Sequence, residues 1–264
     1  MDDVQNHNDE RGIRIDRAGI SGIRYPIVVL DRANEKQHTI ATLRMSVAVP
    51  HDEKGTHMSR FIEVLNEHHG EVTMRTMPAI LKRILHHLDA DSAKIETHFP
   101  YFMTRIAPES GAKGLMDYEC KLIAEASKDQ DDFVLGVRVP VTSLCPCSKS
   151  ISDYGAHNQR GYISIDLRPL RNDDGTPKLM WFEELVTIAE KSASAPVYPL
   201  LKRPDERFVT MQAYDNPVFV EDMVRNVAAK LQSDPRVAWF RVHAVNQESI
   251  HNHDAFAEVT WSQK

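Results

Sequence analysis

The sequence predicts an α+β fold in which antiparallel sheets carry helices on one face. Apolar and polar residues alternate with a period of two in several segments, as is typical of half-buried strands. Each half of the chain places a pair of helical patterns between pairs of such strands, so a ββααββ order occurs twice. Helices cover one face of an antiparallel sheet in this arrangement, and oligomerisation often closes such sheets into barrels without exposed edges.

In the first half, a short apolar run at 25–30 opens the pattern. The segment 38–49 is a clear strand, because Ala41, Leu43 and Met45 share one face while Thr42 and Arg44 share the other. Helices are predicted at 59–69 and 77–88, and further strands at 93–102 and 116–126.

In the second half, Val137, Val139 and Val141 alternate along a strand, and Ile163 and Ile165 alternate along the next. The predicted elements are strands at 133–141 and 163–167, helices at 181–193 and 218–231, and strands at 237–245 and 255–261. We therefore predict a flexible N-terminal extension at 1–23, a first module at 24–128 and a second module at 129–264, without a flexible linker between the modules.

The composition is that of a soluble globular protein, with 42% hydrophobic and 27% charged residues in 264 positions. A net charge of -6 argues against a nucleic-acid-binding protein, which normally carries a basic surplus. No apolar run is long enough to cross a bilayer, and the polar N-terminus lacks the basic and apolar regions of a secretory signal. We expect a cytoplasmic protein that binds neither nucleic acid nor membranes.

The stretch "SLCPCSKSISDYGAHNQRG" at 143–161 connects two predicted strands and is rich in reactive side chains. Cys145 and His157 supply a thiolate and an imidazole, which zinc prefers and iron also uses. Cys147 is a candidate third ligand or a reactive neighbour. The odd total of 3 cysteines and the short spacing argue against a disulfide. The alternative is a buried pair of free cysteines beside an unrelated histidine.

The stretch "QESIHNHDAF" at 247–256 lies between the last two predicted strands. Glu248, His251 and His253 suit general acid and base catalysis, since histidine titrates near neutral pH. The alternative is a solvated polar turn.

Two basic groups are candidates for binding phosphate. Lys202 and Arg203 follow a short apolar run, and Lys54, His57 and Arg60 lie at the start of a predicted helix, where anions also bind. Solvated loops are the alternative for both groups.

Taken together, these residues resemble the type IB GTP cyclohydrolases, a prokaryotic family that makes the first intermediate of folate biosynthesis and is related to the archaeal GTP cyclohydrolases. The resemblance covers nearly the whole chain. It rests on blocks in the family's order, namely "KGTHMSRF", "FPYF", "VPVTSLCPCSK", "YGAHNQR", "LLKRPDE", "NPVFVED" and "ESIHNHDA".

This resemblance implies the tunnelling fold, with two ββααββ modules per chain and a homotetramer whose active sites lie between subunits. It also implies GTP or a related purine nucleotide as substrate, and 7,8-dihydroneopterin triphosphate and formate as products. Cys145 and His157 are then the ligands of a divalent metal, either zinc, manganese or iron. His251 is the acid and base for opening the imidazole ring, and Glu248 assists it. Lys202, Arg203, Lys54 and Arg60 are the groups available for the triphosphate.

Two positions depart from the family pattern. Ala195 and Pro196 stand where the family has a cysteine or serine followed by a ligand glutamate, and Met211 and Gln212 stand in place of a pair that contains the guanine-binding glutamate. Three hypotheses are open at this point. Cys147 completes the metal site and Gln212 reads the base, or the chain acts on another purine or pterin, or it is a catalytically silent paralogue that binds a nucleotide or an active subunit.

Overall fold

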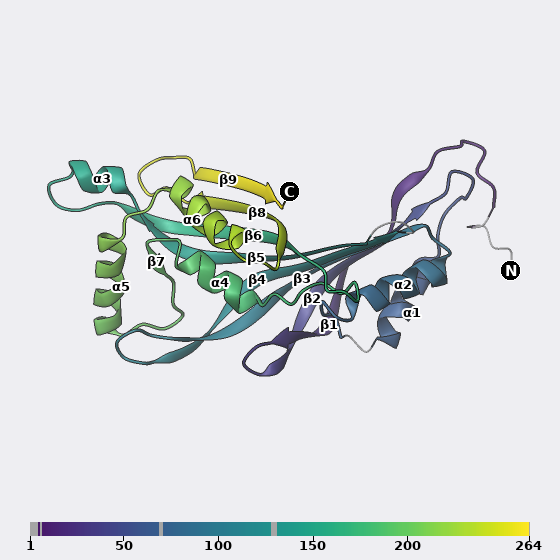
Figure 1. The fold of residues 1–264 in the computed structure, drawn as a ribbon, viewed down its shortest axis with the longest axis horizontal. Coiled ribbons are helices and arrows are strands. Elements are labelled where there is room, and N and C mark those ends of the chain that lie inside the picture. Colours follow the sequence, from purple (N-terminus) through teal and green to yellow (C-terminus); the bar gives the residue numbers. More distant parts are fainter. Residues whose placement is uncertain (1–4, 6, 69–70, 128–130, 264) are drawn as a thin grey trace. The chain divides into compact units, whose positions relative to one another are not determined.

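A computed structural model describes residues 5, 7–68, 71–127 and 131–263. Strands that are neighbours in the order β1-β2-β3-β4-β5-β6-β8-β9 are hydrogen-bonded, and the short β7 pairs with β5 (Figure 1). The strands are β1 (Ile15–Asp31), β2 (Glu35–Val49), β3 (Ser92–Ile106), β4 (Lys113–Ser127), β5 (Asp131–Leu144), β6 (Asn158–Pro169), β7 (Ala195–Pro196), β8 (Val237–Asn246) and β9 (Ala255–Ser262). The helices are α1 (Met58–Glu67), α2 (Met77–Leu88), α3 (Pro146–Ile151), α4 (Phe182–Glu190), α5 (Arg203–Asp215) and α6 (Val220–Gln232).

The antiparallel α+β class is confirmed, because the strand pairs β1–β2, β2–β3, β6–β8 and β8–β9 are all antiparallel. The element order also contains ββααββ twice, with α3, β7 and α5 added in the second half. Barrel closure and the module boundaries stay predictions, and the boundary at 128 and 129 falls outside the described residues. The predicted helix end at His69 and residues 1–4 and 6 of the predicted extension also fall outside them.

The N-terminal extension is shorter than the sequence predicted. Strand β1 begins at Ile15, where it pairs with Val49, and not near residue 24. Register shifts between Ile15 and Ala18 and between Ser21 and Ile23 interrupt the alternation of side chains. Because of these bulges, the sequence of β1 does not alternate with a period of two, and the start of the strand was not predicted.

Contacts divide the chain into two compact units. The first unit contains residues 1–100, 121–135 and 171–177. Its core includes Leu43 and Met45 of β2 and Met77 and Ile84 of α2, all at most 1% exposed. Helices α1 and α2 pack on each other. The predicted inner face of the second strand is thereby confirmed.

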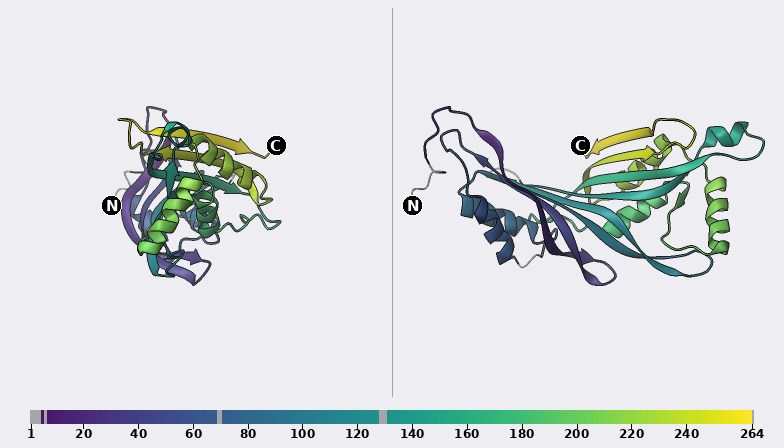
Figure 2. Two further views of the ribbon diagram at one scale, coloured as in Figure 1. Left: turned by 90° about the vertical axis from the view of Figure 1, so that its left-hand side faces the viewer. Right: turned by 180° about the vertical axis from the view of Figure 1, so that it is seen from behind.

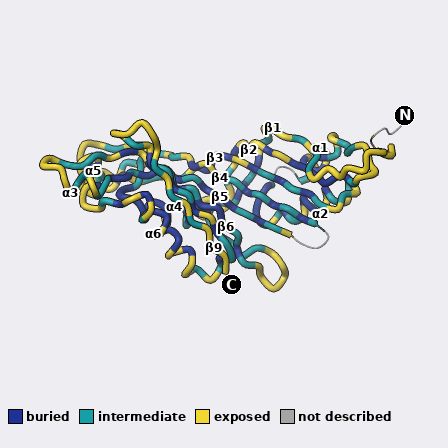
Figure 3. The backbone as a smooth tube through the Cα atoms, turned by 90° about the horizontal axis from the view of Figure 1, so that it is seen from above, coloured by how far each residue is buried: buried dark blue, intermediate teal, exposed yellow. Residues whose placement is uncertain are grey.

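The second unit contains residues 101–120, 136–170 and 178–264 and carries most of the predicted reactive groups. Helix α6 packs on β8 and β9, and α4 packs on α6 (Figure 2). Inward-facing residues such as Val139, Ile163, Ile165 and Phe240 are fully buried under these helices. The residues between them are more exposed, and Figure 3 shows this alternation along the strands. The second unit thus has one buried and one polar sheet face.

In the described part of the chain, no helix is both long and apolar enough to span a membrane.

Close approach of β6 and β8 gives a first prediction. A Cβ atom at Gly161 would lie 2.7 Å from Oδ1 of the buried Asn246 and 3.2 Å from Cγ2 of Val141. Because overpacking of this kind typically costs about 1–3 kcal/mol, we expect Gly161→Ala to lower the free energy of unfolding in urea. Gly155→Ala is the control, since a Cβ there meets nothing within 4 Å. Equal effects of the two substitutions would contradict this account.

Candidate functional site

Cys145 follows β5 directly and is the N-cap of α3. Proline at the first helical position has its φ preset for a helix, so Pro146 starts α3 immediately after the cysteine. The Sγ atom of Cys145 accepts a hydrogen bond from the Ser148 amide at 3.5 Å, and the Ser148 hydroxyl donates to the Cys145 carbonyl at 3.1 Å. These local bonds fix the cysteine at the entrance of the helix.

His157 is brought to Cys145 by the main chain. The Cys145 amide donates to the His157 carbonyl at 3.1 Å, and the His157 amide donates to the Ser148 hydroxyl at 3.2 Å. Both bonds close the 145–157 loop at the base of the strand pair. The main chains at the two residues that the sequence singled out are therefore adjacent.

The imidazole of His157 is held among polar side chains and is only 15% exposed. Its Nδ1 lies 2.9 Å from Oε1 of Gln159, 3.5 Å from Oγ of Ser249 and 3.9 Å from Oε2 of Glu248. The Gln159 amide nitrogen donates to Oε1 of Glu248 at 3.4 Å. The structure thus joins the predicted residues His157 and Glu248 through Gln159, which the sequence did not single out.

Segments distant in sequence anchor the end of β5 immediately before Cys145. The Leu144 amide donates to the Ser194 hydroxyl at 3.0 Å, and the Val218 amide donates to the Leu144 carbonyl at 3.1 Å. The Asn216 amide group donates to the Ala193 carbonyl at 2.9 Å, which fixes the two segments to each other. These hydrogen bonds hold the end of β5 in place and thereby fix the backbone position of Cys145.

Cys145 and His157 fit a divalent metal by their donor chemistry. Because Nδ1 of His157 faces Gln159, Nε2 is the nitrogen left to bind a metal. Among the residues that the structure describes, however, no group of three or more His, Cys, Asp and Glu side chains is arranged to hold a metal ion.

Cys147 was predicted as a third ligand or catalytic neighbour, and the structure does not place it in such a group. It is exposed on α3. At position 196, where the family pattern has a carboxylate, Pro196 pairs with Val141 in β7.

His251 and His253 lie in the turn between β8 and β9, and both are exposed. Their rings are stacked at 5.2 Å with an interplanar angle of 16°. Within the described chain, neither ring makes a hydrogen bond or ion pair with the Cys145 and His157 pair. The structure therefore brings Glu248 to the site and leaves His251 in solvent.

The predicted phosphate-binding residues Lys202 and Arg203 open helix α5 and are exposed. They are positioned by Asp205, which is 0% exposed and accepts hydrogen bonds from the Lys202 amide and from the Glu109 and Ser110 amides, each at 2.8 Å. Burial raises the pKa of Asp205, but these bonds and the Ser110 hydroxyl outweigh it and leave the pKa well below its usual range.

Further along α5, Met211 and Gln212 are both exposed. Lys149, which follows the cysteines, donates to the Tyr214 carbonyl and lies 4.2 Å from the Tyr214 ring. A cation at the carbonyl end of a helix is stabilising, so Lys149 fastens α3 to α5. This role for Lys149 was not predicted.

Lys54 and Arg60 lie in the first unit. The Arg60 guanidinium donates to the His87 carbonyl at 2.9 Å, at the end of α2. The guanidinium that was predicted to bind phosphate therefore already uses one of its nitrogens to connect α1 to α2.

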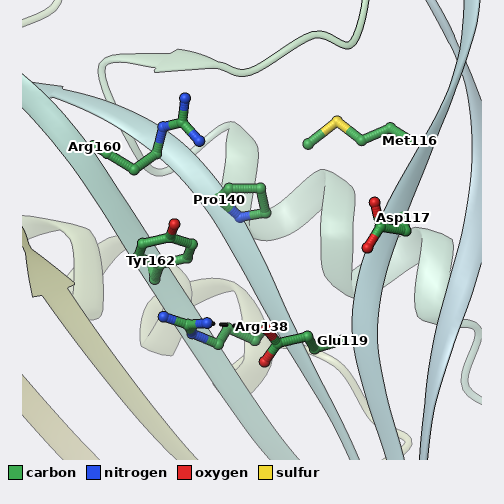
Figure 4. A pocket seen from close by; sticks show the side chains of 7 residues that line it. All are labelled: Met116, Asp117, Glu119, Arg138, Pro140, Arg160 and Tyr162. Atoms are coloured by element: carbon green, nitrogen blue, oxygen red, sulfur yellow. Dashed lines mark hydrogen bonds and ion pairs between the residues drawn. The ribbon is translucent and has the colours of Figure 1, made fainter.

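A cavity of about 240 Å³ opens on the polar sheet face of the second unit (Figure 4). Arg138 lies 3.8 Å above the Tyr162 ring and pairs with Glu119 at 3.1 Å. Arg160 and Asp117 line the cavity from opposite sides. The two arginines and the two carboxylates cancel in charge, so this cavity does not favour a polyanion such as a triphosphate.

A family match and full-length relatives agree on one family. Residues 1–257 match the family described as type I GTP cyclohydrolase folE2. The chain is 52% identical to GTP cyclohydrolase FolE2 of Syntrophotalea carbinolica over 98% of this chain and 94% of that protein. It is 49% identical to GTP cyclohydrolase FolE2 of Syntrophobacter fumaroxidans over 100% of both chains.

Solved structures of uricases share the fold. The uricase of Arthrobacter globiformis superposes with a TM-score of 0.55 at 10% identity, covering 94% of each chain. The urate oxidase of Bacillus subtilis gives a TM-score of 0.54 at 10% identity, covering 94% of this chain and 98% of that one. This likeness concerns the antiparallel α+β architecture alone.

The buried carboxylate of Asp205 gives a second prediction. Its pKa is lowered on folding, so its stabilising effect is present above the unfolded pKa of about 3.9 and is lost as the pH falls towards the lowered value. We expect Asp205→Asn to lower the Tm at pH 7, and the difference from wild type to shrink in acid. Glu206→Gln, at an exposed neighbouring position, is the control. A Tm difference that is independent of pH would refute the charged role.

Proposed function

Because this chain belongs to the type I GTP cyclohydrolase (FolE2) family and is a GTP cyclohydrolase of folate biosynthesis, we propose that its reaction converts GTP and water to 7,8-dihydroneopterin triphosphate and formate. The observation that carries the proposed site is the closed loop that holds Cys145 beside His157, with Glu248 3.9 Å from the imidazole. A thiol, an imidazole and a carboxylate in one partly buried place suit hydrolysis assisted by a metal.

Cys145 and His157 would hold the metal ion, for which zinc, manganese and iron are the candidates. When bound, the ion would supply Lewis acidity that lowers the pKa of water next to C8 of the purine. The soft thiolate and the imidazole favour zinc or iron over magnesium or calcium. Pro196 has no carboxylate to offer as a further ligand.

Glu248 is the chain's proposed proton acceptor at this site. Its side chain is 12% exposed and receives a hydrogen bond from Gln159, so the carboxylate is partly shielded from water and is held in place. His251 is proposed as the acid that protonates the imidazole ring of the purine as it opens. Its place in the same turn, three residues after Glu248, supports this role.

The proposed recognition of the substrate uses helix α5. The amide oxygen of Gln212 can accept a hydrogen bond from an N-H group at the edge of guanine, as one oxygen of a carboxylate would. Lys202 and Arg203 are exposed cations at the N-terminus of the same helix, where the helix dipole also attracts phosphate. Lys54 and Arg60 are the further candidates for the triphosphate.

The two other hypotheses are less favoured. The full-length relatives reported above are named GTP cyclohydrolases. This chain is 49% to 52% identical to them over nearly its full length, despite the substitutions at Pro196 and Met211. We take these positions as variation within the family.

We also propose the tunnelling-fold assembly, a homotetramer with active sites between subunits. Helix α5 supports it, since Phe208, Met211 and Tyr214 are 40%, 46% and 41% exposed at a spacing that places them along one side of the helix. Apolar side chains in such a row are typical of a surface that another subunit covers.

The proposed ligands give a third prediction, which tests the function. We expect Cys145→Ala and His157→Ala each to lower kcat with GTP at least about 100-fold, because even residues that only support a ligand change activity by about 10–100-fold. Fluorescence of the oxidised pterin product and release of formate are measured with added zinc, manganese or iron. Arg225→Ala, at an exposed position on α6, is the control. Full turnover by both ligand variants would disprove the proposed site.

The cations of α5 give a fourth prediction. A hydrogen bond to a charged group is worth about 1.5–3 kcal/mol, so we expect Lys202→Ala or Arg203→Ala to raise KM for GTP about 10-fold or more with a smaller change in kcat. Guanosine monophosphate lacks the two outer phosphates, so its binding should weaken less in the same variants. Its binding is measured as a KM if it is a substrate and as an inhibition constant if it is not. Arg207→Ala, on an exposed turn of the same helix, is the control. Unchanged KM in both variants would rule out this phosphate site.

A further inference from the structure

We propose that Gln159 is a positioning residue of the site formed by Cys145 and His157. Its side chain selects which imidazole nitrogen of His157 faces the metal, and the same side chain holds the Glu248 carboxylate. This inference rests on the proposed function and assigns a role to a residue that is neither a ligand nor a candidate for substrate binding.

The contact between Gln159 and His157 is the shortest that the imidazole makes. Oε1 of Gln159 lies 2.9 Å from Nδ1, whereas the Ser249 hydroxyl lies at 3.5 Å and the nearest Glu248 oxygen at 3.9 Å. Gln159 is 8% exposed, so water does not readily replace this contact. The two residues are separated by one position at the start of β6, and side chains two apart in extended chain lie on the same side.

The surroundings of the amide determine which way it points. Its nitrogen lies 3.4 Å from Oε1 of Glu248 and 3.5 Å from the Ser143 hydroxyl. In the reversed orientation the amide oxygen would face the carboxylate, and two acceptors in contact repel each other. The amide oxygen therefore faces His157, whose Nδ1 must carry the proton. The lone pair of the ring is then on Nε2, ready for a metal.

Gln159 is itself braced by a buried polar chain. The Asn246 amide donates to the Ser143 hydroxyl at 3.0 Å, and this hydroxyl also accepts from Gln159. Ser143 and Asn246 are 1% and 3% exposed and come from β5 and β8. The orientation of the imidazole is consequently fixed by three strands of the second unit.

A neutral amide is better suited to this place than a carboxylate. Either group can accept the proton of Nδ1, but a glutamate would set a second negative charge beside Glu248. The amide instead donates to Glu248 and leaves that carboxylate free of a like charge. Substitution by glutamate therefore separates the two roles of Gln159, since it keeps the contact with His157 and removes the one with Glu248.

Three variants test the inference, which is the fifth prediction. We expect Gln159→Leu to bind zinc about 10–100-fold more weakly, the usual cost of removing a partner of a metal ligand. We expect Gln159→Glu to bind zinc about as well as wild type and yet to lose kcat with GTP. Asn158→Ala, at the exposed neighbouring position, is the matched control and should change neither. Zinc affinity is measured by competition with a chelator, and the Co²⁺ absorption spectrum reports the ligand field.

Zinc and Co²⁺ binding are measured without GTP, which separates this inference from the proposed function. A wild-type chain that binds zinc but does not turn over GTP refutes the activity, while the affinities still decide the role of Gln159. The inference is overturned if Gln159→Leu binds zinc as tightly as wild type. It is also overturned if the leucine and glutamate variants lose zinc affinity equally, or if the wild-type protein binds no zinc. If the leucine variant does not fold, by its circular dichroism, Gln159→Asn replaces it, because its shorter amide cannot span both partners.

Discussion

The site depends on one main-chain hydrogen bond, from the Cys145 amide to the His157 carbonyl at 3.1 Å. The bond closes the loop between β5 and β6, and it places a thiol and an imidazole at adjacent strand ends. Closing a loop costs conformational entropy, and the hydrogen bonds of α3 and of the Ser148 hydroxyl offset part of that cost. Without this closure the two side chains would be independent groups on a mobile connection.

The fold was predictable where side-chain alternation is governed by a single buried face. Helix α2 has the predicted bounds because its apolar stripe is regular and its core face is fully buried. Helix α5 was missed because Asp205 and Ala213 are its only buried residues among those described, so it has no apolar period to detect. Strand β7 is two residues long and exists through pairing with β5, which is a tertiary contact. Such elements follow from neighbours and not from their own sequence.

The site was predictable for groups with distinctive chemistry and not for the groups that hold them. Cys145, His157 and Glu248 stand out in any sequence because few side chains bind metals or move protons. Gln159 and Asn246 look like ordinary polar positions of a strand. Their importance comes from partners 89 and 103 residues away, Glu248 and Ser143, respectively. The ligand or catalytic role of Cys147 stays a prediction, since its chemistry is suitable but the described residues contain no group of three or more His, Cys, Asp and Glu side chains arranged to hold a metal.

The bracing of Ser143 by Asn246 has a consequence for the order in which the site is made. Translation runs from the N-terminus, so Cys145 and Cys147 leave the ribosome long before β8 supplies Asn246 and the following turn supplies Glu248. Until then the growing chain carries two accessible thiols in an open loop. Exposed cysteines are oxidised, and take up unintended metals, more readily than buried ones. The two cysteines are therefore most open to oxidation before β8 has been made.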